Sequence, residues 1–517
     1  MTRLFIVFIL SAFFATSAFA TKIFIPMDSV GQKNHLKAYG VTYAVIANGT
    51  KVDWLLNYKS GSFGMEYSQK TELMCKQRGV SYKKMADKDY VLILKQIAKP
   101  TYNGAVVKLE KAPKIAVYTP LNKEPWDDAV TLALTYAEIP FDKIYADGVL
   151  AGDLDKYDWL HLHHEDFTGQ YGKFWAQFRN ATWYMNDQSA AEALAAKHGF
   201  KKVSQMQLAV AKKIKDFVGS GGNMFAMCCS SETFDIALAA EGTDICDIPF
   251  DGDPIAPGAQ SKLDFSKCFA FRNFTITTNN MDYSRSNIDD TYTRVVLKEN
   301  DFFNLVSFPA KLDLTPAMLC QNHTTSIKGF MGLATAFHNE MLKPGVLVMG
   351  EYKPVNEARY IHGEYGKGTW TFYGGHDPED YRHAVGAPAT DLSLHPTSPG
   401  YRLILNNVLC PAAKRQIVPT VVCCDSISKM EKNAPLSADN IPEIKHPVKI
   451  YPNPSDNELI ISSNTKIEHI VIFNSAGVEV FKQSYNSEKA SVDMADLPAG
   501  MYLIQVNGEY AGKVVKN

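Results

Sequence analysis

The chain has 517 residues, of which 46% are hydrophobic and 21% charged, and this composition excludes disordered, collagen-like and coiled-coil proteins. Lysine and arginine number 53 against 55 acidic residues, so the formal net charge is -2. This balance gives no electrostatic attraction to nucleic acid or anionic membranes, and we expect neither as a partner. At roughly 150 residues per domain, the length predicts about three domains.

Residues 1–20 predict an N-terminal signal peptide. Arg3 precedes an apolar run over residues 4–10, and Ala18 and Ala20 have the spacing of a cleavage site. The run is shorter than the roughly 20 residues of a transmembrane helix, and no later stretch reaches that length. We therefore expect an exported protein without a transmembrane segment.

Residues 21–110 and 111–415 predict two α/β regions. In the second, strands expected at Lys114–Thr119, Lys143–Tyr145 and Tyr157–Leu162 alternate with helices at Pro125–Ile139 and Val203–Val218. Such alternation predicts a parallel sheet covered by helices on both faces. The first region has a similar strand, helix, strand order and is interpreted as a related α/β half, although such units also recur by coincidence. We interpret residues 241–345 as an inserted subdomain.

A strand followed by a polar turn and a helix surrounds Cys228. Ala226 and Ser230 lie two residues to either side of it, which is the small-residue spacing of a nucleophile elbow. At a helix N-terminus, the partial positive charge favours a thiolate and the free N–H groups can hold an oxyanion. The alternative is a buried cysteine pair, Cys228 and Cys229, at the end of a core strand.

A nucleophilic cysteine needs a base, and His376 is the strongest candidate. It follows the expected strand Thr369–Tyr373, and the ends of parallel strands converge on one edge of a sheet. Asp377 or Glu379 is the candidate carboxylate that orients His376. Alternatively, His376 makes a local hydrogen bond in a glycine loop, and the carboxylates cap a turn.

A second polar cluster follows the strand that ends at Leu162. Alternation along the strand places His161 and His163 on one face. Metal binding, hydrogen bonding to substrate and a structural role remain open for this cluster. We expect neither a metal nor a cofactor. We assign five residues to substrate binding, four from this cluster and one from the elbow: His163, His164, Glu165, Asp166 and Ser230.

Nine cysteines are present. In an oxidising compartment an odd number leaves at least one thiol unpaired, and Cys246 could pair with Cys268 or Cys320.

Short alternating segments predict a small antiparallel β-sandwich at the C-terminus. The expected strands are Glu458–Ser462, His469–Asn474, Val478–Gln483, Ala490–Asp493 and Met501–Val506. Residues 416–446 contain several prolines and no periodicity, and this predicts a linker.

The motifs of the C-terminal region resemble the type IX secretion C-terminal sorting domain. They are Tyr451-Pro452-Asn453-Pro454, Asn474-Ser475-Ala476-Gly477 and Leu497-Pro498-Ala499-Gly500-Met501-Tyr502, and the resemblance covers residues 447–517. It implies that the type IX secretion machinery is a partner, and that the protein passes through the periplasm and is secreted or placed on the outer cell surface. The alternative is an ordinary adhesive sandwich.

The elbow, the segment 366–377 and an expected helix at Tyr401–Leu409 resemble the class I glutamine-amidotransferase-like superfamily, and most of all its trehalose-utilisation branch. The resemblance covers about residues 114–415 and implies a flavodoxin-like α/β fold with a Cys-His-Glu site. Two features depart from the pattern, since the elbow lacks glycines flanking the cysteine and His376 is followed by Asp-Pro-Glu. Members of that branch often lack the cysteine.

The body from residue 34 to residue 380 is also similar to exported bacterial proteins commonly labelled asparagine synthetase B. A synthetase needs an N-terminal cysteine and a Ser-Gly-Gly-x-Asp-Ser loop for ATP. Here Thr21 follows the signal peptide, and the segment 220–225 reads Ser-Gly-Gly-Asn-Met-Phe. We therefore do not expect ATP-dependent asparagine synthesis.

The sequence thus predicts an α/β protein with a flavodoxin-like parallel sheet, an inserted subdomain and a C-terminal antiparallel β-sandwich. The expected function is that of an exported type IX substrate with an amidotransferase-like core, a thiol-dependent hydrolase of small amide substrates in which Cys228 is the nucleophile and His376 the base. The alternative is a non-catalytic cell-surface or carbohydrate-binding protein of the same fold, with a glycan as its ligand.

Overall fold

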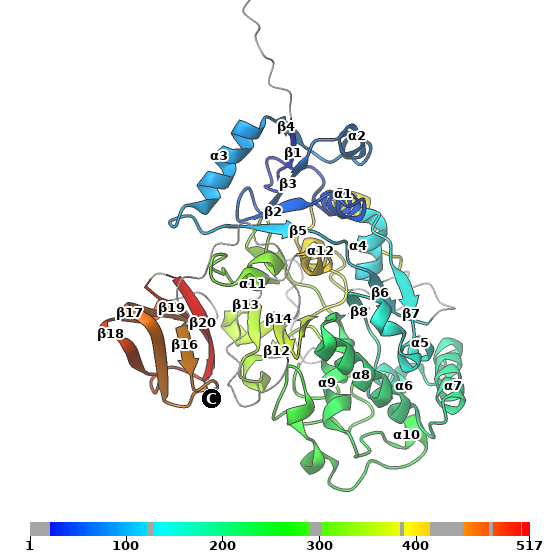
Figure 1. Ribbon diagram of the computed structural model, residues 1–517. Coiled ribbons are helices and arrows are strands. Elements are labelled where there is room, and N and C mark those ends of the chain that lie inside the picture. The colour runs from blue at the N-terminus through cyan, green and yellow to red at the C-terminus, as the bar shows by residue number, and fades with distance from the viewer. Residues whose placement is uncertain are drawn as a thin grey trace, which may run out of the picture.

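The computed structural model describes residues 21–120, 128–289, 301–382, 387–413, 448–474, 479–507 and 509–516. The expected signal peptide (1–20) and linker (416–446) lie outside these described residues. The described strands form three sheets, one in each of the N-terminal, central and C-terminal regions (Figure 1).

The N-terminal sheet has the strand order β4-β1-β3-β2-β5, and all its pairings are antiparallel. Its elements are β1 Lys22–Ile25, α1 His35–Ala47, β2 Val52–Leu56, β3 Ser62–Glu66, α2 Gln69–Gln77, β4 Lys83–Met85, α3 Asp87–Ala98 and β5 Ala105–Leu109. The order β1, α1, β2 matches the expected pattern of an α/β half. Because β3 lies between β1 and β2, the N-terminal sheet resembles the central sheet only in the order of β1, α1 and β2 along the chain.

The central sheet has the order β11-β10-β13-β14-β15-β9-β8-β6-β7, with β12 beside β14. Its strands are β6 Ile115–Tyr118, β7 Asp142–Ile144, β8 Trp159–Leu162, β9 Asn223–Met227, β10 Phe302–Leu305, β11 Ser326–Lys328, β12 Phe337–His338, β13 Leu347–Tyr352, β14 Glu357–Tyr365 and β15 Gly368–Tyr373. The five strands from β15 to β7 pair in parallel, as expected. The other pairings are antiparallel, so the expected parallel sheet is corrected to a mixed one.

The physical reason for the mixed sheet lies in short connections. The turn at Gly366 and Lys367 joins β14 to β15 as a hairpin, and a connection this short forces antiparallel pairing. The segment 241–345, expected to be a separate subdomain, contributes β10, β11 and β12 to this antiparallel side of the same sheet.

Helices cover both faces of the parallel strands, as the alternating pattern predicts (Figure 1). They are α4 Ala129–Ala137, α5 Ala146–Ala151, α6 Trp175–Phe178, α7 Thr182–Lys197, α8 Val203–Ser220, α9 Cys229–Ala239, α10 Ile248–Asp251, α11 Leu314–Leu319 and α12 Pro399–Leu409. In β9, Phe225 and Met227 pack in the cluster that contains α1, α4 and α12, whereas Met224 and Ala226 pack in the cluster of α5, α8 and α9. Alternate side chains of one strand therefore serve two hydrophobic cores.

Close packing joins the N-terminal region to the central one. A Cβ atom on Gly40 of α1 would lie 1.7 Å from the carbonyl oxygen of Ala137 in α4, so only glycine permits this helix contact. In α12, the buried guanidinium of Arg402 donates to the hydroxyl of Tyr39 at 3.0 Å and to the carbonyl oxygens of Met27 and Ser60.

The C-terminal region is a single curled antiparallel sheet of β16 Val448–Tyr451, β17 Glu458–Asn474, β18 Glu479–Asp493, β19 Gly500–Val506 and β20 Glu509–Lys516. The antiparallel strands expected here are therefore confirmed, and they form one curled sheet. Two of the strands expected separately are halves of β17, which pairs with β16 along its first half and with β19 along its second. Register shifts between Ser462 and Ile467 accompany this change of partner, and such irregularities bend a strand without ending it.

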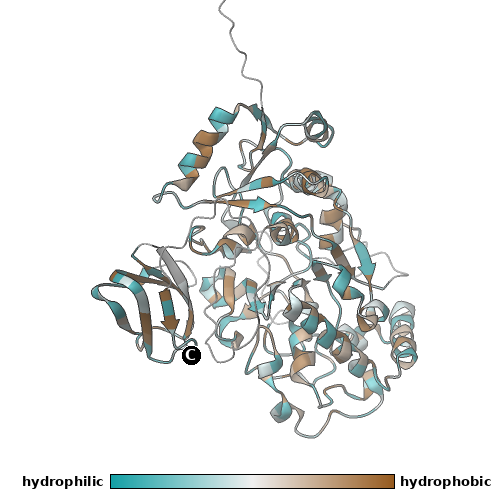
Figure 2. Ribbon diagram, viewed as in Figure 1, coloured by the Kyte–Doolittle hydropathy of each residue, from teal (hydrophilic) through white to brown (hydrophobic). Residues whose placement is uncertain are grey.

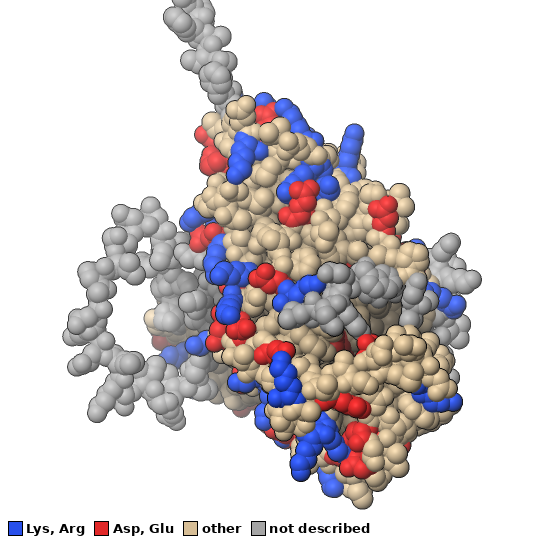
Figure 3. Space-filling model, turned by 90° about the vertical axis from the view of Figure 1, so that its right-hand side faces the viewer, with Lys and Arg blue, Asp and Glu red and all other residues tan. Residues whose placement is uncertain are grey.

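The surface carries charges of both signs, as the nearly balanced composition predicts. Figure 2 shows a hydrophobic stretch on α3, where Val91 and Leu92 are exposed while Tyr90 and Ile97 are buried. In Figure 3, basic and acidic residues are interspersed over the face in view. Within the part of the chain that the structure describes, no helix is both long enough and apolar enough to cross a membrane.

Candidate functional site

The candidate site lies at the carboxyl edge of three neighbouring parallel strands, β8, β9 and β15. Ala226 of β9 is in register with Leu162 of β8 and with Phe372 of β15. The residues that directly follow these strands therefore reach the same edge, and the structure brings Cys228 together with the histidines 163, 164 and 376 there. Polar residues at this edge are the usual ligand-binding groups of open α/β sheets.

Cys228 has the strained backbone of a sharp strand-to-helix turn. It lies between the end of β9 and the start of α9, with φ 52° and ψ -139°. This combination is a region of conformational space that is essentially restricted to glycine, and it costs a non-glycine residue about 1–3 kcal/mol. The N–H of Cys228 donates to the carbonyl oxygen of Gly375 at 3.0 Å, which connects the turn to the residue before His376.

Hydroxyl groups in the first turn of α9 hold the bend in place. The Ser231 hydroxyl donates to the carbonyl oxygen of Cys228 at 2.7 Å. The hydroxyls of Ser230 and Thr233 donate to the carbonyl oxygen of Glu165 at 3.0 and 3.2 Å. Ser230 and Thr233 thus connect α9 to the loop after β8.

The sulfur of Cys228 is buried and faces backbone donors. Its residue is 1% exposed, and the N–H of Leu333 donates to Sγ at 3.2 Å. A Cβ atom on Gly332 would lie 3.1 Å from this sulfur, so the turn at 332–333 packs directly on it. The Cys229 thiol lowers the pKa of Cys228 against the opposing effect of burial, and the Leu333 N–H and the charge of His164 lower it further.

The neighbouring Cys229 behaves in the opposite way. The Cys228 sulfur and burial raise the pKa of Cys229 well above its usual range. Its thiol donates to the carbonyl oxygen of His164 at 2.9 Å. Because the one S–H proton of Cys229 faces this carbonyl, the fixed N–H of Leu333 is the steadier donor to Cys228.

Three imidazoles pack against one another beside this turn. Nδ1 of His163 and Nδ1 of His164 lie 3.0 Å apart. The ring of His376 lies 4.4 Å from that of His163 and 6.0 Å from that of His164, between ring centres. His163 is buried, His376 is half-buried and His164 is exposed.

Asp128 is a site residue that the sequence analysis missed. Its carboxylate lies 3.1 Å from Nε2 of His161 and 3.4 Å from Nδ1 of His163, and it caps α4 by accepting from the N–H groups of Val130 and Thr131. Burial opposes its charge, but His161 and the two N–H groups more than offset this and lower the pKa of Asp128. Aspartate directly before a helix is a capping signal, but nothing local indicates that it faces the histidines.

The two carboxylates expected to orient His376 make other contacts. Asp377 is buried and accepts from the N–H groups of Glu379 and Asp380, at 2.9 and 3.3 Å. Glu379 lies 3.2 Å from Nδ1 of His395. The turn-capping alternative therefore describes Asp377, whereas Asp128 contacts His161 and His163.

The residues assigned to substrate binding separate into two groups. His163 and His164 lie at the edge with Cys228, whereas Ser230 is buried and its hydroxyl contacts backbone. Asp166 forms an ion pair with Arg285 at 3.1 Å, in which Nε of Arg285 is the donor. Asp166 also accepts from backbone N–H groups, so it organises the protein interior.

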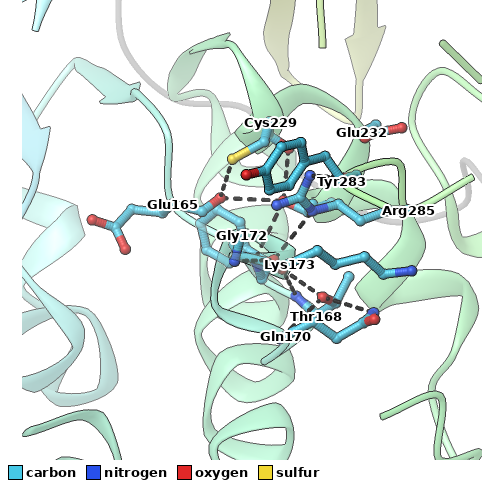
Figure 4. Close-up of polar contacts among 12 residues, drawn as sticks. Glu165, Thr168, Gln170, Gly172, Lys173, Cys229, Glu232, Tyr283 and Arg285 are labelled. Atoms are coloured by element: carbon cyan, nitrogen blue, oxygen red, sulfur yellow. Dashed lines mark hydrogen bonds and ion pairs between the residues drawn. The ribbon is translucent and has the colours of Figure 1, made fainter. Parts of the chain in front are cut away.

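Figure 4 shows the polar contacts around Arg285 and Lys173, with the carboxylate of Glu165 pointing away from them. Burial raises the pKa of Glu232 to about 8, although the Arg285 charge opposes the shift. Glu232 accepts from the hydroxyl of Ser286 at 3.1 Å, and Asp166 and Asp289 add negative charge near it. Burial also lowers the pKa of Lys173 to about 8.

Disulfides are not formed among the seven cysteines that the structure describes. The thiols of Cys246 and Cys268 donate instead to the carbonyl oxygens of Thr168 and Asp235, at 3.1 and 3.4 Å. Cys246 therefore pairs with neither Cys268 nor Cys320, the two partners that the sequence left open.

Comparison with solved structures finds only distant likenesses. Cytoplasmic Protein STM3548 from Salmonella typhimurium is 11% identical over 58% of this chain and 100% of its own, with a TM-score of 0.29. Cytoplasmic Protein STM1381 from Salmonella typhimurium LT2 is 13% identical over 58% of this chain and 100% of its own, with a TM-score of 0.30. A beta-galactosidase from Bacillus circulans sp. alkalophilus is 11% identical over 75% of this chain and 40% of its own, with a TM-score of 0.24. Scores this low assign neither fold nor function.

No curated protein matches the chain. Residues 449–517 match the family of the secretion system C-terminal sorting domain. This match confirms the resemblance carried by the C-terminal motifs, and it covers the curled sheet from β16 to β20. The C-terminal region is therefore a type IX sorting domain, and the chain is a type IX secretion substrate that is exported and attached to the cell surface or released.

Proposed function

We propose that the exported body of this chain is a thiol-dependent hydrolase of amide bonds, with Cys228 as nucleophile. The observation that carries the proposal is the backbone of Cys228, which holds a non-glycine residue at φ 52° and ψ -139° between a parallel strand and a helix. Strain of this kind persists only where the surrounding structure imposes it, and it is concentrated at functional sites.

Backbone donors support this chemistry. The N–H of Leu333 points at the sulfur from 3.2 Å, and the backbone N–H of Cys229, in the first turn of α9, also faces it. The Leu333 N–H stabilises the thiolate while the turn at 332–333 is closed, and the N–H groups at the start of α9 stabilise the oxyanion that forms when the thiolate attacks a carbonyl carbon.

An imidazole supports the proton transfers. His164 and His376 both lie at the edge where Cys228 is presented, and either ring could take the thiol proton and return it to the leaving amine. In the first step, a C–S bond forms and the C–N bond breaks. In the second, water cleaves the thioester and restores the thiol.

The order of the parallel strands supports an amidotransferase-like core. In chain order they are β6, β7, β8, β9 and β15, and across the sheet they run β7-β6-β8-β9-β15. This second, first, third, fourth, fifth arrangement is that of flavodoxin-like sheets, whose ligands bind outside the carboxyl ends of the strands.

The burial of the sulfur favours the other candidate, a non-catalytic surface protein of the same fold. At 1% exposure, Cys228 meets a substrate only if the turn at 332–333 moves aside. The two functions therefore differ in whether the thiol reacts with a small electrophile in the folded protein.

Alkylation of the purified full-length protein with iodoacetamide near neutral pH tests the proposal. If Cys228 is activated, mass spectrometry will find it labelled fastest of the cysteines, and His164→Ala or His376→Ala will slow this labelling at least about tenfold. Cys268→Ser is the matched control, because it removes another buried thiol, which contacts the carbonyl oxygen of Asp235, and it will leave the labelling of Cys228 unchanged. Slow labelling of Cys228 at the rate of the other buried thiols, unchanged by both histidine substitutions, refutes the enzyme and favours the non-catalytic protein.

A further inference from the structure

We propose that His163, His164 and His376 form a binding site for a borderline divalent metal ion such as Zn²⁺ at the carboxyl edge of the central sheet. One ring nitrogen of each residue lies within 4.8 Å of a ring nitrogen of the other two. This inference goes beyond the proposed hydrolase, because it requires only the three imidazoles and does not require Cys228 to react.

The spacing suits tetrahedral coordination after a small adjustment. With Zn–N bonds of about 2.0–2.1 Å, two nitrogens on a tetrahedral ion lie about 3.3 Å apart. The His163 and His164 nitrogens, 3.0 Å apart, are already near this distance. His164 is exposed and can move without repacking the core, so it can close the remaining separation from His376.

The other two rings are held in place. His163 is buried, stacks against His161 at 5.9 Å between ring centres and lies 3.4 Å from Asp128. Because Asp128 lies beside Nδ1, the nitrogen of His163 that also faces His164, its negative charge stabilises a cation bound there. The N–H of His376 donates to the carbonyl oxygen of Met331 at 2.9 Å, which fixes the backbone from which this ring extends.

The donor set determines the kind of ion. Three imidazole nitrogens suit Zn²⁺, Cu²⁺, Ni²⁺ or Co²⁺, whereas Ca²⁺ and Mg²⁺ prefer oxygen ligands. Three protein ligands also leave a fourth position for water or a ligand, as in catalytic zinc sites. The exposed ring of His164 gives an ion a path from solvent.

Among the described residues, a second group of possible metal ligands is already paired with a lysine. Asp244, Cys246 and Asp251 lie together, but the ammonium of Lys202 forms ion pairs with both aspartates and with Asp253. The positive charge that these carboxylates need is therefore supplied by the chain itself.

The test is a titration of the full-length protein, stripped with a chelator, with Zn²⁺ by calorimetry and with Co²⁺ by visible absorption. One equivalent per chain will bind, and the Co²⁺ form will show the intense bands of tetrahedral coordination. His164→Ala and His376→Ala will each weaken binding at least about tenfold. Asp128→Asn will also weaken it, because the negative charge beside Nδ1 of His163 is lost.

Two controls separate this site from the proposed hydrolase. His198→Ala removes a histidine of α7's C-terminal end that contacts Asp147, and binding will be unchanged. Cys228→Ser abolishes the proposed nucleophile and will also leave binding unchanged, so the two proposals fail independently. The three-histidine site would be overturned if no stoichiometric binding is found, or if the His164 and His376 variants bind the metal as tightly as the wild type. A thiolate band of the Co²⁺ form that disappears in Cys228→Ser would also overturn it.

Discussion

Replacing Cys228 by glycine and by alanine measures the strain at the elbow. Both substitutions remove the sulfur and its contact with Leu333, and they differ in the backbone freedom of residue 228. In ordinary helical or extended backbone, glycine is less stable than alanine by about 0.5–1 kcal/mol because it loses more conformational entropy on folding. At φ 52° and ψ -139°, alanine keeps the strain of about 1–3 kcal/mol and glycine does not.

We therefore expect the usual order to invert, with Cys228→Gly more stable than Cys228→Ala by about 0.5–2 kcal/mol. Urea unfolding followed by tryptophan fluorescence measures this difference, since the buried Trp159 in β8 and Trp370 in β15 report on the central sheet. Ala237→Gly in the helical part of α9 is the matched control and will be destabilising. An alanine variant as stable as the glycine variant, or more so, would show that residue 228 is not strained and would remove the observation on which the hydrolase rests.

Three further substitutions test the packing and electrostatics of the body. Glu232→Gln will remove a pH dependence: an acid whose pKa is raised to about 8 by burial loses folded-state stability as pH rises from about 4.5 to 8. The stability of the variant relative to the wild type will therefore increase by at most about 1.4 kcal/mol per pH unit in that window. A difference in urea midpoint between variant and wild type that is the same at pH 5 and at pH 8 would contradict this. Gly40→Ala will destabilise by about 1–3 kcal/mol or more, because its Cβ meets the backbone of Ala137, and an unchanged thermal midpoint would exclude the close contact. Arg402→Met will cost about 3–5 kcal/mol in urea unfolding because Tyr39 and two carbonyl oxygens lose a buried charged donor, whereas a loss under 1 kcal/mol would show that the network is dispensable.

Local patterns were enough to predict the elbow and the edge on which it lies. Strand β9, the polar turn and α9 follow directly from the apolar run ending at Met227 and the hydroxyl-rich segment after it. The approach of His376 and His163 to Cys228 follows from parallel pairing alone, because strands in register end together. The common face of His161 and His163 is likewise confirmed by their stacking.

Contacts between residues distant in sequence could not be predicted in this way. Arg285 lies 119 positions from Asp166, and their ion pair depends on how the inserted segment folds back beneath α9. Asp128 reaches the histidines because α4 packs on β8, and periodicity gives only the helix. The curled C-terminal sheet differs from a sandwich through the bending of one long strand, and such bends leave little trace in alternation.

The two proposals place competing demands on the same imidazoles. A ring nitrogen that ligates a metal ion has its lone pair in the metal bond, so it cannot also take a proton from a thiol. If Zn²⁺ occupies His164 and His376 together, neither ring remains as a base for Cys228, while the backbone N–H groups at the start of α9 are unaffected. A bound metal ion would therefore remove the imidazole base from the site. It would leave the backbone N–H donors for the oxyanion in place.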